Sequence, residues 1–191
     1  MKRSLNRINA TCLKRKTARG IVPGLKSNIS KALKGRYIFG MPQSLASNLI
    51  HLVYSTKSRK PWLVDESRRG LFAYQSGIFK KWESPAIVIG GVEDHVHALF
   101  SLSKNYALKK IVEEVKKGSS KWMKTSEGTG NKNFCWQAGY AAFSVSQSNV
   151  SKVIAYIENQ KEHHRKKNFQ DELRALFDRH GIEFNEQYVW D

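Results

Sequence analysis

Residues 91–100 read Gly-Val-Glu-Asp-His-Val-His-Ala-Leu-Phe and place two histidines inside an otherwise largely apolar run. Such a run, rich in branched and aromatic residues, is typical of a buried β-strand. Side chains alternate between the two faces of a strand, so His95 and His97 are expected on one face and Val96 on the other. Two neutral imidazoles side by side on a rigid strand offer two ligands to one metal ion. Half-exposed strand histidines without a ligand are the alternative.

The composition favours a polyanionic partner and a reducing compartment. The 191 residues include 33 lysines and arginines against 16 acidic residues, a net charge of +17. This excess favours nucleic acid, with an acidic membrane surface as the lesser alternative. The chain has no apolar run long enough to span a bilayer and no secretory signal core, so we predict no membrane association. Cys12 and Cys135 are far apart, which argues against a disulfide framework or a cysteine zinc site and fits the cytoplasm.

Residues 1–40 form a basic segment that differs from the rest of the chain. They contain eleven lysines and arginines, no acidic residue and no sustained apolar period. We therefore predict a disordered basic arm, followed by one folded domain over residues 41–191. The alternative is that translation starts at Met41 and that the preceding residues are an upstream extension of the gene.

The remainder of the chain predicts an α+β fold. Branched and aromatic runs predict strands, and apolar residues at helical spacing predict helices. The predicted strands cover residues 49–55, 86–92, 94–100 and 139–146, and the predicted helices cover residues 65–82, 106–124, 148–166 and 170–180. The second and third strands follow each other so closely that we expect a hairpin. This order is that of a ferredoxin-like antiparallel sheet with helices on one face.

Two of the predicted helices carry polar residues of interest. In the helix over residues 148–166, spacings of four and three place Tyr156, Gln160 and His163 on one face, beside an aliphatic stripe. The alternative is that Tyr156 extends the core and Gln160 lies on the surface. The helix over residues 106–124 has five lysines that form either a solvated face or contacts to phosphate. These are Lys109, Lys110, Lys116, Lys117 and Lys121.

Four stretches, taken together, resemble one protein family. They are residues 51–57 (His-Leu-Val-Tyr-Ser-Thr-Lys), the run Asp94-His95-Val96-His97, residues 136–146 (Trp-Gln-Ala-Gly-Tyr-Ala-Ala-Phe-Ser-Val-Ser) and the run Tyr156-Ile157-Glu158-Asn159-Gln160. Their order and spacing, from about residue 44 to the C-terminus, resemble the TnpA-type single-tyrosine HUH transposases of bacterial insertion sequences. The resemblance implies the HUH endonuclease variant of the ferredoxin-like fold.

The resemblance also implies a role for each matched residue. His95, His97 and Gln160 would hold a divalent ion, Mg²⁺ or Mn²⁺, and Tyr156 would be the nucleophile. The implied reaction cuts and rejoins single-stranded DNA at hairpin-marked element ends through a 5′-phosphotyrosine intermediate. Family members are similar in forming homodimers, in many of which the tyrosine helix completes the partner's site. His163, one turn beyond Gln160, is a further candidate for proton transfer.

The sequence leaves three alternatives to a transposase open. A domesticated relative would cut chromosomal repeat hairpins without moving an element. A non-catalytic module would bind single-stranded nucleic acid with the same sheet and charge. A metal-dependent hydrolase would need the histidines but would tolerate the loss of the Tyr156 hydroxyl.

Overall fold

The computed structural model describes residues 44–126 and 130–190. The chain divides into two units, Met1–Ser44 and Leu45–Asp191, and the fold below is that of the second unit. The basic arm predicted at residues 1–40, and Met41 as an alternative start, lie outside the described residues. None of the described helices is long and apolar enough to cross a membrane.

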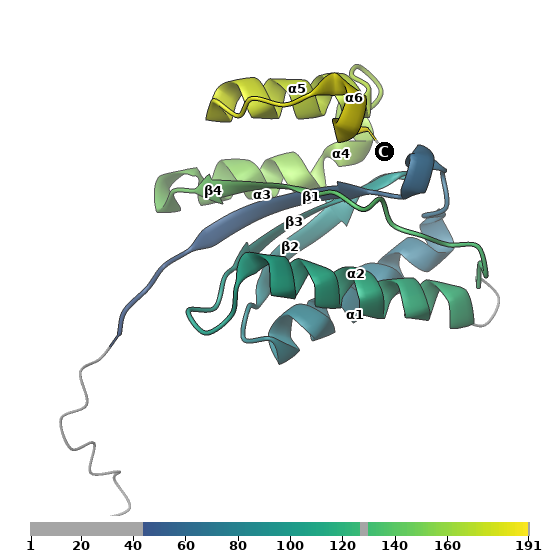
Figure 1. Ribbon diagram of the computed structural model, residues 1–191, viewed down its shortest axis with the longest axis horizontal. Coiled ribbons are helices and arrows are strands. Elements are labelled where there is room, and N and C mark those ends of the chain that lie inside the picture. The colour runs from purple at the N-terminus through teal and green to yellow at the C-terminus, as the bar shows by residue number, and fades with distance from the viewer. Residues whose placement is uncertain (1–43, 127–129, 191) are drawn as a thin grey trace, which may run out of the picture. The chain divides into compact units, whose positions relative to one another are not determined.

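The second unit is built on a four-stranded antiparallel sheet in the order β2-β3-β1-β4 (Figure 1). The strands are β1 (Leu49–Ser55), β2 (Ala86–Gly91), β3 (His95–Ser101) and β4 (Ala141–Val145). All four predicted strands are therefore present, and β2 and β3 form the predicted hairpin. The central strand β1 pairs with β3 on one side and with β4 on the other.

Helices α1 (Asp65–Lys81) and α2 (Leu108–Thr125) cover one face of this sheet and enclose the main hydrophobic core. The alternate residues Leu52 and Tyr54 of β1 and Val96 and Phe100 of β3 point into this core. They meet the apolar stripes of both helices, which include Leu71, Phe79, Ile111 and Val115. The ferredoxin-like α+β class is confirmed, and these two helices provide the predicted layer on one face.

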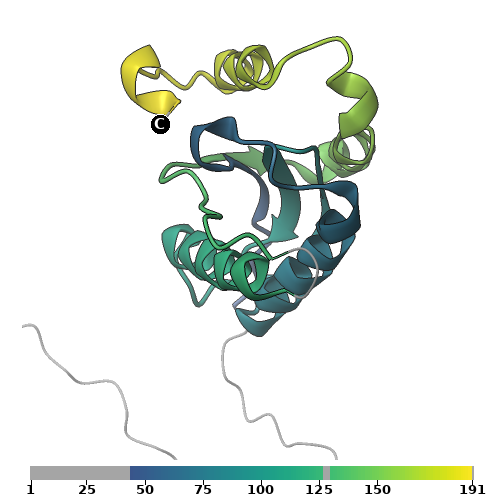
Figure 2. The ribbon, with the colours of Figure 1, turned by 90° about the vertical axis from the view of Figure 1, so that its right-hand side faces the viewer.

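The structure adds a second helical layer on the opposite face. It contains α3 (Val150–Glu158), α4 (Gln160–His163) and α5 (Phe169–His180), and a short α6 (Glu186–Val189) follows (Figure 2). Single 3₁₀ turns occur at Lys57–Arg59 and Gln147–Asn149. The layer forms because β1 and β4 are also apolar on this side, where Val53 and Phe143 pack against Leu173 and Phe177 of α5. The prediction of helices on one face thus describes only α1 and α2.

The single helix predicted over residues 148–166 is interrupted at Asn159, where α3 ends and α4 begins. The side-chain amide of Asn159 donates to the Ala155 carbonyl at 2.8 Å, and that of Gln160 lies 3.5 Å from the Tyr156 carbonyl. Side chains that bond to nearby carbonyls compete with the helical ladder, which is the local reason for the break. The predicted end of the last long helix is confirmed, since Gly181 caps α5 with φ 62° in the left-handed region.

Candidate metal centre and nucleophile

Three buried histidines from adjacent strands line the face of the sheet that α3, α4 and α5 cover. His95 and His97 of β3 are fully buried, and His51 of β1 is nearly so. Nε2 of His51 lies 2.9 Å from Nδ1 of His97. Alternation along β3 turns Val96 to the opposite face, where it packs in the main core as predicted.

Tyr156 in α3 and Gln160, the first residue of α4, reach this group of histidines from the helical layer that covers it. The Tyr156 ring stands edge-on to the rings of His51 and His97, with centroids 6.0 and 5.8 Å away. Gln160 is buried, and its Oε1 lies 3.4 Å from Nε2 of His95. The structure therefore brings together the four residues predicted as ligands and nucleophile.

Gly90 in β2 allows α3 to approach the sheet this closely. It pairs with His97 across the hairpin. A Cβ at this position would lie 2.5 Å from the carbonyl oxygen of Ile157 and 2.8 Å from its Cγ2. Any larger residue would therefore push α3, and Tyr156 with it, away from His97.

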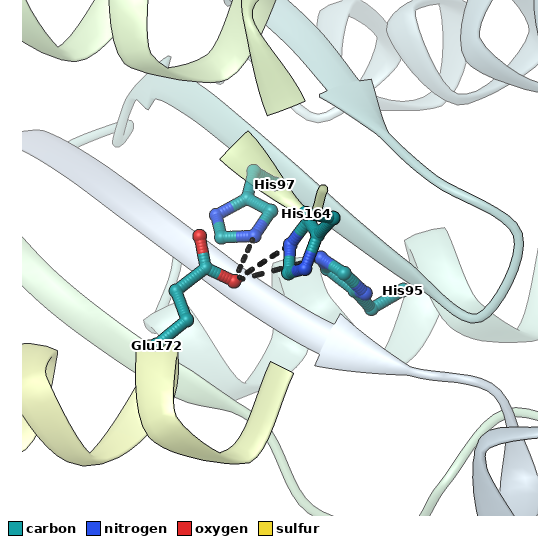
Figure 3. A group of neighbouring side chains, drawn as sticks. All are labelled: His95, His97, His164 and Glu172. Atoms are coloured by element: carbon teal, nitrogen blue, oxygen red, sulfur yellow. Dashed lines mark ion pairs between the residues drawn. The ribbon is translucent and has the colours of Figure 1, made fainter. Parts of the chain in front are cut away.

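Two residues outside the predicted site complete the group: Glu172 of α5 and His164, which follows α4. Oε2 of Glu172 lies 3.6 Å from Nε2 of His95, 3.5 Å from Nε2 of His97 and 3.1 Å from Nε2 of His164 (Figure 3). One ligand atom from each of the four residues falls within 4.8 Å of the others. Three imidazoles and a carboxylate thus converge on one point.

The sequence holds one signal for Glu172. It lies on the buried stripe of α5, three residues after Phe169 and four before Leu176, where an apolar residue is expected. Glutamate is almost never fully buried unless it is paired. An acidic residue inside an apolar stripe therefore indicates a buried partner. His164 has no comparable signal beyond its position next to His163.

Each of the three converging imidazoles is oriented through its Nδ1 atom. The partners of Nδ1 are the Asp94 carboxylate at 2.7 Å for His95, Nε2 of His51 at 2.9 Å for His97, and the Lys167 carbonyl at 2.9 Å for His164. The carboxylate and the carbonyl can only accept, so they assign the proton of His95 and His164 to Nδ1. In the neutral forms of His95 and His164, Nε2 then carries the lone pair and faces the common centre. Partners of this kind orient ligating histidines in metal sites.

Burial and neighbouring charges set the protonation of the group. Burial lowers the pKa of His51 to about 3 and, despite the nearby Glu172, that of His97 to about 4, so both are neutral at pH 7. Burial alone would raise the pKa of Glu172, but the surrounding imidazoles and the Tyr156 hydroxyl hold it far below its usual value. The carboxylate in turn outweighs burial at His164 and raises the pKa of that imidazole. Glu172 is therefore a buried anion.

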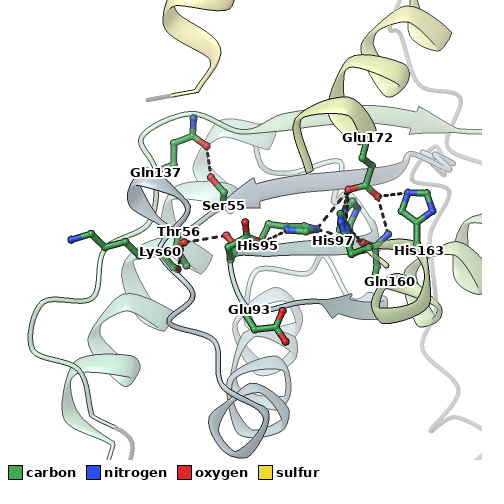
Figure 4. A network of polar contacts seen from close by, with 12 residues as sticks. Ser55, Thr56, Lys60, Glu93, His95, His97, Gln137, Gln160, His163 and Glu172 are labelled. Atoms are coloured by element: carbon green, nitrogen blue, oxygen red, sulfur yellow. Dashed lines mark hydrogen bonds and ion pairs between the residues drawn. The ribbon is translucent and has the colours of Figure 1, made fainter. Parts of the chain in front are cut away.

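The second oxygen of Glu172 faces Tyr156. The Tyr156 hydroxyl donates a hydrogen bond to Oε1 of Glu172. The Gln160 amide donates to the same oxygen at 3.0 Å (Figure 4). Nε2 of His163 lies 3.5 Å from this oxygen. Burial and the Glu172 charge raise the pKa of Tyr156 above its usual range. One carboxylate therefore touches both the histidine group and the tyrosine.

The five predicted DNA-contacting lysines lie on α2, on the opposite face of the sheet from the histidines. Lys116 donates to three backbone carbonyls, at 2.7 Å (Gln137), 3.3 Å (Ala138) and 2.6 Å (Gly139). Burial lowers its pKa to about 8. Lys110 pairs with Glu114 at 2.7 Å. The other three are exposed: Lys109, Lys117 and Lys121. Their contact with DNA stays a prediction, and any such contact would lie away from Tyr156.

A cavity of about 410 Å³ opens beside Tyr156, between α3, α5 and β4. Its walls include the rings of His51 and Phe143 as well as the tyrosine itself. Lys152 and Arg179 also line it, and both are exposed. Tyr156 is thus reached through an opening with an apolar wall and a cationic edge.

The chain matches one family model and resembles solved transposase structures. The family is described as "Transposase IS200 like", and residues 44–160 match it. A candidate transposase from Deinococcus radiodurans R1 is 23% identical, with 63% of this chain and 97% of that chain covered and a TM-score of 0.49. A REP-associated tyrosine transposase bound to a REP hairpin is 13% identical, with 65% and 73% covered and a TM-score of 0.49. No curated protein matches the chain.

The family match includes both strand histidines, Tyr156 and Gln160, and it ends before His164 and Glu172. It spans more than half of the chain and agrees with the resemblance seen in the sequence. The family also supports a DNA-cutting role. The chain belongs to the IS200-like transposases.

Proposed function

We propose that this transposase cuts and rejoins single-stranded DNA through a covalent bond between Tyr156 and the 5′ phosphate, assisted by a divalent ion. The observation that supports this most strongly is the hydrogen bond of the Tyr156 hydroxyl to the carboxylate that lies among the buried histidines. A phenol held next to ion-binding groups, at the side of an open cavity, is suited to attack on a phosphodiester.

The proposed step is a transesterification. The Tyr156 oxygen forms a bond to phosphorus and the bond from phosphorus to the 3′ oxygen breaks, while the phenol gives up one proton and the leaving oxygen takes one up. The raised pKa of Tyr156 means that its proton needs an acceptor. His163, near the oxygen that holds the hydroxyl, is the proposed carrier. An incoming 3′ hydroxyl reverses the step and rejoins the strand without ATP.

His95, His97 and Gln160 fit a divalent ion. Nε2 of His97 is buried and has no hydrogen-bond partner within residues 44–126 and 130–190, as expected of a ligand atom. When bound, the ion would supply Lewis-acid stabilisation of charge on the scissile phosphate. An amide oxygen with two imidazoles suits Mg²⁺ or Mn²⁺, and the imidazoles favour Mn²⁺.

Single-stranded DNA that carries hairpins is the proposed substrate. The net charge of +17 favours a polyanion. Lys152 and Arg179 at the cavity next to Tyr156 are suited to the backbone of a single strand. One similar solved structure is of a relative bound to a REP hairpin. We further propose that the exposed lysines of α2 contact the hairpin and that the protein acts as a homodimer, which sedimentation would test.

Covalent capture of DNA tests this function. The protein is incubated with labelled hairpin DNA and Mn²⁺ and then denatured. We expect the wild type to retain the label and Tyr156→Phe to lose it. Tyr74→Phe is the matched control, because Tyr74 lies on α1 at the other face of the sheet and should leave capture unchanged.

Two other outcomes would identify the alternatives. A wild type that binds the hairpin but retains no label would be a non-catalytic binding module. Cutting that persists in Tyr156→Phe but is lost in His97→Ala would indicate a metal-dependent hydrolase. Flanking DNA with element ends would separate an active transposase from a domesticated repeat endonuclease.

A further inference from the structure

The buried carboxylate of Glu172 lies beyond the residues that match the family. One of its oxygens faces the histidines, and the other contacts Tyr156. We propose that Glu172 and His164 join His95, His97 and Gln160 as ligands of one divalent transition-metal ion, with Glu172 binding through Oε2 while its Oε1 holds the Tyr156 hydroxyl. Helix α5 then supplies a ligand and positions the nucleophile next to the ion. Only the role of the ion in DNA cutting rests on the proposed function. The binding of the ion does not.

The convergence of the ligand atoms is the first support for this centre. Those of the three histidines and Glu172 lie within 4.8 Å of one another, although their residues come from a strand, the end of a short helix and a separate helix. Glu172 is 2% exposed, and His95 and His97 are 0% exposed. Burial of this kind leaves no room for the hydration of the carboxylate, so its charge needs a partner inside the protein.

The directions of the lone pairs are the second support. The Nδ1 contacts of His95 and His164 leave the Nε2 lone pairs of the neutral imidazoles directed at two acceptors, Oε2 of Glu172 and Oε1 of Gln160. Neither Oε2 of Glu172 nor Nε2 of His97 has a hydrogen-bond partner in the described part of the chain. Without a cation, this arrangement places acceptor atoms against one another in a buried site. One divalent cation would satisfy all of these groups at once.

Gln160 has a supporting contact with the carboxylate. Its amide nitrogen donates to Oε1 of Glu172 at 3.0 Å, next to the Tyr156 hydroxyl. This bond fixes the plane of the carboxylate, so that one oxygen faces the histidines and the other faces the tyrosine. Carboxylates that ligate metals are commonly held by hydrogen bonds of this kind.

The donor set predicts the class of ion. Three imidazoles and one carboxylate favour transition metals such as Mn²⁺, whereas Mg²⁺ prefers oxygen ligands. We therefore expect tighter binding of Mn²⁺ than of Mg²⁺ by the full chain without DNA.

Titration calorimetry with Mn²⁺ on the full-length protein tests the centre without an activity measurement. Glu172→Gln keeps the size of the side chain and an acceptor for Tyr156 but removes the charge, and we expect Mn²⁺ binding at least about 10-fold weaker. Asp178→Asn is the matched control on the same helix, because Asp178 is exposed, and it should bind Mn²⁺ like the wild type. Equal affinity in Glu172→Gln and the wild type, or no Mn²⁺ binding by the wild type, would overturn the proposal.

A second measurement covers the case in which Glu172→Gln does not fold. Pulsed electron paramagnetic resonance of bound Mn²⁺ detects coordinated imidazole nitrogen, and His164→Asn should lose one of three such signals. An unchanged signal would remove His164 from the centre and contradict the proposed set of ligands. Tyr156→Phe should bind Mn²⁺ normally yet capture no DNA. Mn²⁺ binding by a wild type that captures no DNA would refute the proposed function and leave the centre intact.

Discussion

The two faces of the sheet use the same strands for different purposes. On the side of α1 and α2, β1 contributes Leu52 and Tyr54 to an apolar core. On the side of α3 and α5, β1 contributes His51 and Val53, which alternate with Leu52 and Tyr54 along the strand. Of these two, only Val53 packs in an apolar cluster. Residues that are neighbours in sequence therefore point either to a core that stabilises the fold or to the buried polar group of the candidate site.

Residues that stabilise the fold and residues of the candidate site therefore lie on separate faces of one strand. A polar group buried beside a small apolar cluster contributes less to folding than a packed core of aromatic and aliphatic residues does. We therefore expect a substitution on one face of β3 to reduce DNA cutting with little effect on stability. A substitution on the other face should lower stability with little effect on the candidate site. The predictions below test that separation.

The largest effect is expected for His97→Ala. The loss of a central ligand should reduce DNA cutting by at least about 10³-fold, because Lewis-acid stabilisation contributes several kcal/mol to the transition state. Hairpin binding should change little, since His97 is fully buried and lies away from the exposed lysines of α2. Gel assays of cutting and binding on the same DNA check this. A parallel loss of binding would mean that the two faces are not independent.

Phe100→Ala tests the other face. Phe100 is fully buried and packs against Phe79, with ring centroids 4.8 Å apart. Its truncation should lower the free energy of unfolding by about 3–5 kcal/mol. Urea unfolding measures this, and the folded fraction should still bind Mn²⁺ with wild-type affinity. Weakened ion binding by the folded protein would show that the core and the polar group are coupled.

Gly90→Ala tests the close contact between β2 and α3. The new Cβ would overlap the Ile157 carbonyl and displace Tyr156, so cutting should fall about 10- to 100-fold, as misplacement of a reacting group does. Gly77→Ala on α1 is the control, because nothing lies within 4 Å of its added Cβ. It should leave cutting unchanged and stabilise the helix by up to about 1 kcal/mol. Equal activity of both variants would contradict the close approach.

The last prediction is a pH dependence of stability in metal-free protein. His51 and His97 have folded pKa values of about 3 and about 4, below the usual 6.5. Their contribution is fully present above pH 6.5 and is lost as the pH falls, because the unfolded chain then binds more protons. Each should reduce the free energy of unfolding by about 1.4 kcal/mol per pH unit below that value. His164, whose pKa is raised, acts in the opposite direction.

Urea unfolding with a chelator between about pH 7 and pH 5 measures this slope. His51→Gln should make it shallower, since glutamine cannot titrate and can still contact Nδ1 of His97. An unchanged slope in this variant would mean that His51 is not buried in its neutral form.

The sequence predicts most of the fold and half of the candidate centre. Alternation along β3 is a local signal, and it correctly predicts that His95 and His97 share the face opposite to Val96. The break at Asn159 was missed because side-chain competition with the helical ladder is weak and common. Glu172 was missed because its partners are distant in sequence, and the second helical layer depends on the same long-range packing.

The position of Glu172 in α5 has a consequence for how copies of this gene decay. The residues that match the family end at residue 160. A nonsense mutation between residues 161 and 172 would leave every family motif legible and yet remove the buried carboxylate and the helix that carries it. Under the proposed centre, such a pseudogene would look intact by its motifs and its product would be inert. Truncation from the 3′ end of the gene would thus inactivate the protein while the residues that match the family stay intact.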